Sequence, residues 1–360
     1  MQIIHALAGI QTGYSWLTIC LTGLLAIGAW SVVHRGKCEL RTFGKDDTLP
    51  LRGLLALLVV IGHLDNHTGH FFQCLSYIHW STPAVGVFFF LSGYGVCKSY
   101  EGAVRSGRDS GYAGRFLLKA LIRLLPLLLS TWIILLAYQW MVGGFRAELI
   151  FHKVYSGEFV QTPGSWYVYA LLIFYLGFCL AMRFESLCFR MLVLLAVVTG
   201  YYMITRYSLS LGRNWWQTAY AFPVGYLFSA QEGRIRDFVA RHPIAGYSFA
   251  IVLFLGAFGL YRLNGIPLIG KAREPFFAIL GVPVVLWFYS GGALRRFGPL
   301  RMLGVCSYEI YLVHCLFLRE FQAFGLSPYA YVALVLGVTA LLVPLLYRFD
   351  SLVIGLLSRK

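Results

Sequence analysis

The chain has 360 residues, of which 59% are hydrophobic and only 12% are charged. Soluble globular domains carry about 25% charged residues, so this composition excludes a soluble protein, and the mean hydropathy of +0.70 indicates repeated membrane crossings. The net charge of +15 does not predict a nucleic-acid partner, because the basic residues are spread between apolar runs. The eight cysteines form no paired CxxC motif, so the sequence predicts neither a disulfide framework nor a metal site.

Eleven apolar runs approach the length of about 20 residues that a helix needs to cross a bilayer. They cover residues 14–33, 51–70, 82–100, 117–140, 165–183, 187–206, 215–230, 243–261, 275–290, 303–321 and 329–348. The sequence therefore predicts an all-α integral membrane protein, a polytopic bundle of about 11 transmembrane helices. Two of the runs are short and contain Pro223 and Pro283, which predicts kinked or re-entrant helices there.

The distribution of lysine and arginine predicts the orientation of this bundle. With the N-terminus outside, 22 of the 30 basic residues fall on cytoplasmic loops and helix ends, and eight fall outside. The opposite orientation inverts this ratio and violates the positive-inside bias. We therefore expect the N-terminus outside and the C-terminus in the cytoplasm, with Cys38 on the cytoplasmic side and Cys74 on the outer side.

An arginine and a histidine interrupt the second run, at Arg52 and His63. Eleven residues at 100° each place both side chains on one helix face, about 16 Å apart along the axis. Polar groups this costly in hydrocarbon are retained mainly where they have a function. The pair suits a long anionic ligand with phosphates near Arg52 and a reactive group near His63. On this stretch alone, a snorkelling arginine and an unrelated pore or packing histidine explain the pattern equally well.

Four motifs in order resemble those of the acyltransferase 3 family of membrane-embedded acyltransferases. They are Arg52-x10-His63 within LRGLLALLVVIGHL, FFFLSG at 88–93, SWY at 165–167 and SYEIYLVH at 307–314. The resemblance spans the second to the eleventh run. It implies an extra N-terminal transmembrane helix and basic cytoplasmic loop over residues 1–50, and a ten-helix membrane acyltransferase domain over residues 51–360. It also implies a bacterial inner-membrane location.

The resemblance implies acyl-CoA, expected to be acetyl-CoA, as co-substrate and no resident cofactor. Arg52, Lys119 and Arg123 are the expected partners of the donor phosphates at the cytoplasmic mouth. The family often has two arginines three residues apart before a Leu-x-Pro, whereas Ala120 stands at the first of these positions. Lys119 is a point charge and not a planar fork, so it replaces that arginine incompletely. The positive-inside bias also explains Lys119 and Arg123.

His63 and Arg52, on the same helix face, are the expected catalytic residues. Imidazole titrates near the working pH, so His63 can deprotonate an acceptor hydroxyl, or it can carry the acyl group itself. The side chains expected to line the cavity are Ser92, Trp166, Tyr167, Tyr311, His314 and Glu309. Ser92 with Gly93 also fits a small-residue packing notch. A zinc site at His63, His67 and His70 is conceivable but not predicted, because Gly69 and the following loop argue against an ordered helix there.

The resulting prediction is a membrane O-acyltransferase that moves an acyl group from cytoplasmic acyl-CoA to a hydroxyl of a glycan or lipid-linked sugar. Six aromatic residues could stack on such an acceptor, although an interfacial aromatic belt explains most of them equally well. They are Trp80, Trp140, Trp166, Tyr167, Trp215 and Trp216. One alternative is a transporter that uses Arg52 and His63 for substrate binding or proton relay. Inverted repeats would support it, and none is apparent. A second alternative is an acyltransferase with an amine or small-molecule acceptor.

Overall fold

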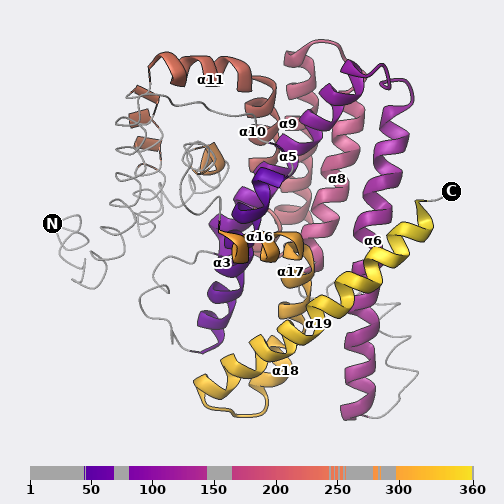
Figure 1. Ribbon diagram of the computed structural model, residues 1–360, viewed down its shortest axis with the longest axis vertical. Helices are drawn as coiled ribbons and strands as arrows, with labels where there is room; N and C mark the ends of the chain where they lie inside the picture. The colour runs from indigo at the N-terminus through magenta and orange to yellow at the C-terminus, as the bar shows by residue number, and fades with distance from the viewer. Residues whose placement is uncertain are drawn as a thin grey trace.

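The computed structural model describes residues 46–68, 81–143, 164–242 and 297–358, together with Gly44 and scattered positions between 245 and 284. Every regular element in these ranges is a helix, which confirms the all-α prediction for this part of the chain (Figure 1). The α-helices are α3 (Leu49–His67), α5 (Ser81–Arg105), α6 (Tyr112–Gly143), α8 (Ser165–Ala181), α9 (Leu187–Met203), α10 (Ala221–Ala230), α11 (Glu232–Arg241), α16 (Gly298–Val305), α17 (Ser307–Leu316), α18 (Leu318–Gln322) and α19 (Pro328–Leu357). Shorter helical turns are η1 (Asp46–Thr48), η3 (Ile204–Ser208) and η4 (Arg213–Trp215).

Four described stretches are long and apolar enough to cross a membrane by length and composition. They are Asp46–His67, Tyr112–Tyr138, Leu187–Ser208 and Pro328–Leu357. Each coincides with a predicted run, and α8 and α10 are shorter apolar helices. The first predicted run, together with Cys38, Cys74 and Trp80, lies outside the described residues, as do most of the runs at 243–261 and 275–290. The total of eleven spans stays a prediction.

The prediction of one continuous span over residues 303–321 is wrong, because the helix is interrupted at Cys306 and Phe317. These residues have ψ angles of 18° and 2°, far from the α-helical value of about −42°. The run is thereby divided among α16, α17 and α18. The Tyr331 hydroxyl of α19 donates a 2.8 Å hydrogen bond to the Leu318 carbonyl beside the second break. Irregular backbone at membrane depth needs such side-chain partners.

The predicted run at 215–230 also differs from the structure. Its helix, α10, begins only at Ala221, after the turn η4 and a short irregular segment. Pro223 therefore lies in the first turn of α10, where a missing backbone N–H costs no intrahelical hydrogen bond. In the described part of the chain, this proline begins a helix and does not kink one.

Glycines allow two pairs of helices to bring their backbones into contact. A methyl group on Gly53 of α3 would overlap the Leu300 carbonyl of α16, and one on Gly304 of α16 would overlap that of Leu49. The pair α5 and α10 crosses in the same way at Gly93 and Gly225. Small residues at such crossings are typical of helices that associate within membranes.

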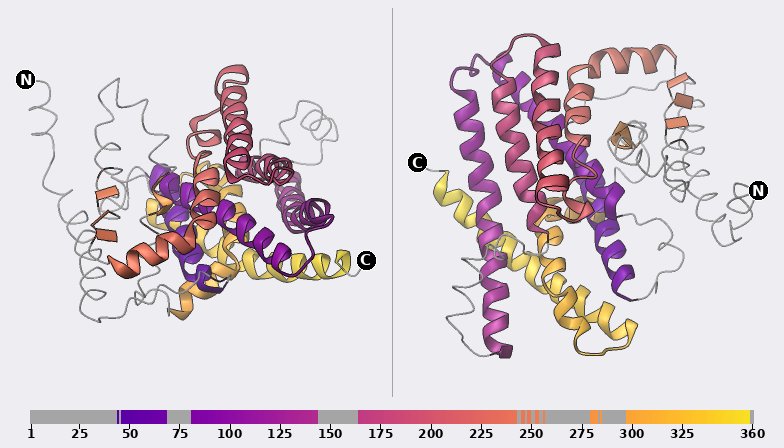
Figure 2. Two further views of the ribbon diagram at one scale, coloured as in Figure 1. Left: turned by 90° about the horizontal axis from the view of Figure 1, so that it is seen from above. Right: turned by 180° about the vertical axis from the view of Figure 1, so that it is seen from behind.

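The helices α6, α8 and α9 run side by side, while α3 and α5 pass obliquely beside them with α16 and α17 packed on α3 (Figures 1 and 2). The long helix α19 crosses α6 at an angle in the same views. Fully buried aromatic rings fill the space between α5, α8 and α10, including Phe89, Phe174, Phe178 and Phe222. Together with the packing of α16 and α17 on α3, these contacts hold the helices around two cavities.

Candidate active site

A cavity of about 650 Å³ lies beside the first turns of α3. We call it the inner cavity, and four basic side chains line it, from Arg52, Lys98, Lys119 and Arg123. Lys98 is already neutralised, because its Nζ lies 2.7 Å from a carboxylate oxygen of Glu232. No aspartate or glutamate is among the described residues that line this cavity. Three basic residues therefore face the space without a carboxylate on its walls, which makes it suitable for an anion.

Arg52 and Arg123 lie close enough to repel each other electrostatically, and both line the inner cavity together with Tyr167. Within the described part of the chain, neither guanidinium has an ion-pair partner within 4.0 Å. Arg52 is half-buried. Arg123 and Lys119, in the part of α6 that lines the cavity, are exposed. An anionic group between these guanidinium groups would relieve their repulsion.

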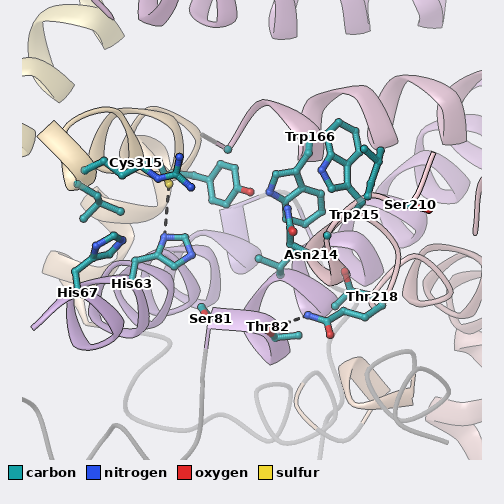
Figure 3. A pocket seen from close by; sticks show the side chains of 18 residues that line it. His63, His67, Ser81, Thr82, Trp166, Ser210, Asn214, Trp215, Thr218 and Cys315 are labelled. Carbon is teal, nitrogen blue, oxygen red and sulfur yellow. Dashed lines mark hydrogen bonds between the residues drawn. The ribbon is translucent and has the colours of Figure 1, made fainter. Parts of the chain in front are cut away.

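A second cavity of about 500 Å³ lies at the opposite end of α3. We call it the outer cavity, and Figure 3 shows His63, His67 and Cys315 on one side of it and Trp166 and Trp215 on the other. Its other polar lining groups come from Ser81, Thr82, Ser210, Asn214, Gln217, Thr218 and Arg319. The described lining contains no carboxylate. The described side chains of this wall that offer a basic ring nitrogen are therefore the two imidazoles.

The hydrogen bonds around His63 fix the positions of its ring protons. His314 Nδ1 lies 2.7 Å from the carbonyl oxygen of Ile310, and a carbonyl only accepts, so His314 Nδ1 is the donor. In neutral His314, Nε2 is then an acceptor, and it lies 2.9 Å from Nδ1 of His63. His63 therefore donates from Nδ1 and keeps a free lone pair on Nε2. This is the tautomer that a general base requires.

The residue next to His314 also contacts this pair. Sγ of Cys315 lies 3.5 Å from Nδ1 of His63 and 3.3 Å from Nε2 of His314, and Figure 3 marks its contact with His63. Cys315 is buried within the protein, yet it lines the outer cavity. His314 is completely buried behind His63.

Tyr311 lines both cavities, so the two spaces adjoin at its ring. The ring lies 5.2 Å from that of Tyr167 and 6.2 Å from that of His314, measured between centroids. It is therefore packed between the tyrosine of the inner cavity and the histidine pair of the outer cavity. A ligand that extends from Arg52 toward His63 must pass this residue.

The structure places the sequence-predicted residues in three groups. Arg52, Lys119, Arg123, Ser92, Tyr167 and Tyr311 line the inner cavity. His63 and Trp166 line the outer cavity, which Tyr311 shares. His314 and Glu309 line neither of these two cavities. Glu309 is buried, and its Oε2 has no hydrogen-bond partner within the described part of the chain.

Sequence reasoning missed Cys315 and the polar wall formed by residues 210–218. The predicted run at 215–230 assigned Gln217 and Thr218 of this wall to a membrane span, and residues 210–214 fell in the loop before it without a predicted role. The sequence also left open which tryptophans line this cavity. Trp166 and Trp215 line the outer cavity, whereas Trp216 is buried against the Arg206 guanidinium, which lies 4.5 Å from its ring centroid.

A helical membrane protein with a cationic cavity and an imidazole-bearing cavity that meet at one residue has the parts of a transferase acting on an anionic donor. A family model described as an acyltransferase domain matches residues 51–348. The chain belongs to the acyltransferase 3 family, as its four motifs indicate, and it is a membrane acyltransferase. This assignment favours the enzyme over the transporter alternative. No curated protein and no solved structure matches the chain at a significant level.

Proposed function

We propose that this chain is an O-acyltransferase that moves an acetyl group from cytoplasmic acetyl-CoA to a hydroxyl of a glycan or lipid-linked sugar. The observation that carries the proposal is the arrangement of two cavities at opposite ends of α3 that adjoin at Tyr311. One has the charge that a phosphorylated donor needs, and the other has the base that an acceptor hydroxyl needs. The bacterial inner membrane is the proposed location.

The inner cavity is the proposed donor site. CoA carries phosphates at one end and a thioester at the end of a long thin arm. Arg52 and Arg123 can each bind a phosphate through two parallel hydrogen bonds, and Lys119 adds a third charge. With the phosphates held there, the arm extends along α3 toward Tyr311, and the thioester meets the outer cavity.

The outer cavity is the proposed acceptor site. Its wall combines hydroxyl and amide groups with the indole rings of Trp166 and Trp215. Hydroxyls and amides exchange hydrogen bonds with sugar hydroxyls, and indole rings cover the apolar faces of a sugar ring. Gln217 Nε2 donates a 3.2 Å hydrogen bond to the Thr82 hydroxyl and thereby orients its amide on this wall. A neutral, polar acceptor fits this wall, because its described lining residues include no carboxylate that could bind an amine.

We propose direct transfer, because two cavities that adjoin at Tyr311 would let both substrates approach this residue from opposite sides at the same time. Nε2 of His63 accepts the proton of the acceptor hydroxyl, whose oxygen attacks the thioester carbonyl. The new ester bond forms as the carbon–sulfur bond breaks, and the proton on His63 balances the thiolate that leaves. The alternative, an acyl group carried on His63, predicts acylated enzyme when donor is supplied without acceptor. Mass spectrometry after a single turnover distinguishes the two routes.

The experiment that tests the proposal uses sealed vesicles in which the protein has one known orientation. Labelling of Cys74 but not Cys38 by an impermeant thiol reagent on intact cells establishes that orientation, although both residues lie outside the described part of the chain. Acetyl-CoA is then supplied on the cytoplasmic face only, and a glycan acceptor on the outer face only. Acetyl ester on the outer face supports the proposal. Ester that forms only when both substrates share the cytoplasmic face contradicts it.

A further inference from the structure

Three potential metal ligands converge on the wall of the outer cavity. They are Nδ1 of His63, Nε2 of His314 and Sγ of Cys315, and all lie within 4.8 Å of one another. Their separations are 2.9 Å between the two nitrogens, and 3.5 and 3.3 Å from the sulfur to His63 and His314. In a tetrahedral zinc site, bond lengths of about 2.05 Å to nitrogen and 2.3 Å to sulfur give edges of about 3.3 and 3.6 Å. The three atoms need to separate by only a few tenths of an ångström.

The surroundings of this triangle complete the requirements of such a site. A histidine ligand usually donates its other ring N–H to a fixed acceptor, and His314 Nδ1 already donates to the Ile310 carbonyl. His63 and Cys315 both line the outer cavity, so an ion can enter from that side and keep a water molecule as its fourth ligand. Three protein ligands plus an open position is the usual coordination of an accessible zinc ion.

We propose that His63, His314 and Cys315 form a binding site for a zinc-like divalent cation, and that the bound cation switches off the base. Binding releases one proton, from the Cys315 thiol, because the sulfur coordinates as a thiolate. The Nδ1 proton of His63 moves to Nε2 of the same ring, because Nδ1 must coordinate through its lone pair. His63 then has no lone pair left for an acceptor hydroxyl. The inhibition rests on the proposed role of His63, whereas the binding site does not.

Cobalt is the probe for the binding site, because a cobalt–thiolate bond produces a charge-transfer band in the near ultraviolet. The full chain in detergent is stripped of metal, kept reduced with a phosphine and titrated with Co²⁺. We expect a band that saturates at one equivalent and disappears when Zn²⁺ is added. Cys315→Ser should abolish the band. Cys97→Ser is the matched control, because Cys97 is equally buried but lines neither cavity, and it should keep the band.

A second measurement requires no variant. Saturating Zn²⁺ should nearly abolish alkylation of the Cys315 thiol of the wild-type chain, because a thiolate bound to the metal is no longer a free nucleophile. Absence of the cobalt band, a band that survives Cys315→Ser, or a Cys315 alkylation rate that zinc leaves unchanged overturns the site.

Activity measurements separate this inference from the proposed function. Zn²⁺ should inhibit acyl transfer by the wild type, and the inhibition constant of Cys315→Ser, measured against its own zinc-free rate, should rise at least about tenfold. Metal binding with unchanged transfer would uphold the site and contradict the role of His63 as base. Inhibition of the wild type and of Cys315→Ser at the same zinc concentration would contradict the proposal that a cation bound at this site inactivates the base.

Discussion

His63 and His314 are joined by a 2.9 Å hydrogen bond although 251 residues separate them in the sequence. The bond connects α3 to α17, and the two rings also stack with their centroids 5.1 Å apart. Because His314 is itself anchored to Ile310, one turn of α17 determines which nitrogen of His63 faces the outer cavity with a free lone pair. The orientation of the proposed base is therefore a property of tertiary packing.

Replacement of His63 by alanine should lower turnover by about 10² to 10⁴, which is the usual contribution of a positioned general base. The variant should still be extracted and purified as a folded protein, because the side chain is only half-buried. His67→Ala removes the other imidazole of the same wall and should cost much less. Wild-type turnover in purified His63→Ala would show that this histidine is not the base.

His314 should act as a positioning residue. His314→Phe removes the acceptor for the His63 Nδ1 proton and should lower kcat about tenfold or more, the cost of a lost buried hydrogen bond, with little change in KM for acyl-CoA. His314→Gln keeps an acceptor oxygen and should restore part of kcat. Steady-state kinetics on both variants measures the changes in kcat and in KM for acyl-CoA separately. Equal losses in the two variants, or a loss that appears in KM, would indicate a merely structural side chain.

Arg52→Ala and Arg123→Ala should each weaken CoA binding. A charge-assisted hydrogen bond contributes about 1.5–3 kcal/mol, which corresponds to a factor of about 10 to 150 in the dissociation constant. Arg52→Lys should recover only part of the affinity, because an ammonium lacks the bidentate geometry. Arg115→Ala is the control, since this exposed arginine of α6 does not line the inner cavity. Calorimetric titration that finds wild-type affinity in both cavity variants would place the donor elsewhere.

Tyr311→Ala should uncouple acyl-CoA cleavage from transfer. The tyrosine ring is only 5% exposed and separates the two cavities, so its loss opens a route for water to the thioester. In Tyr311→Ala, we expect the ratio of CoA release without acceptor to acyl transfer to rise several-fold. Tyr311→Phe keeps the ring and should resemble the wild type. The measurement is thiol release with and without acceptor. An unchanged ratio in Tyr311→Ala would argue against a shared boundary.

Gly93→Ala should destabilise the protein while Gly95→Ala should not. A methyl group at Gly93 would overlap the backbone of Phe222, whereas one at Gly95 meets nothing within 4 Å. Forced contacts of this kind cost about 1–3 kcal/mol, and both substitutions have the same intrinsic effect on helix α5. Thermal unfolding in detergent gives the comparison. Similar unfolding temperatures for the two variants would mean that α5 and α10 do not touch as described.

The sequence was informative where chemistry follows from spacing along one helix. Arg52 and His63 could be placed on one face of α3 because helical periodicity depends only on the residue count. The four motifs similarly identified the family over most of the length of the chain. The donor residues Lys119 and Arg123 came from the resemblance to the family's basic motif before Leu-x-Pro, and not from helical spacing.

The remaining parts of the site depend on contacts between helices distant in sequence. Nothing in the pattern of SYEIYLVH shows that His314 turns away from the cavities to support His63. The break at Phe317 was not apparent from the apolar pattern either, and the hydroxyl that bonds to the Leu318 carbonyl beside it comes from Tyr331 of α19, a helix distant from α3 in sequence. Hydropathy averages over a window, and it therefore merges a broken helix into one continuous span.

The interruptions at Cys306 and Phe317 leave α17 as a separate rigid rod of 10 residues. Along this rod, Tyr308 contacts the inner cavity, Tyr311 contacts both and Cys315 contacts the outer one. A displacement of the rod along its axis changes both spaces together. Donor and acceptor affinities are therefore expected to be thermodynamically linked, so that each substrate alters the affinity for the other by the same factor.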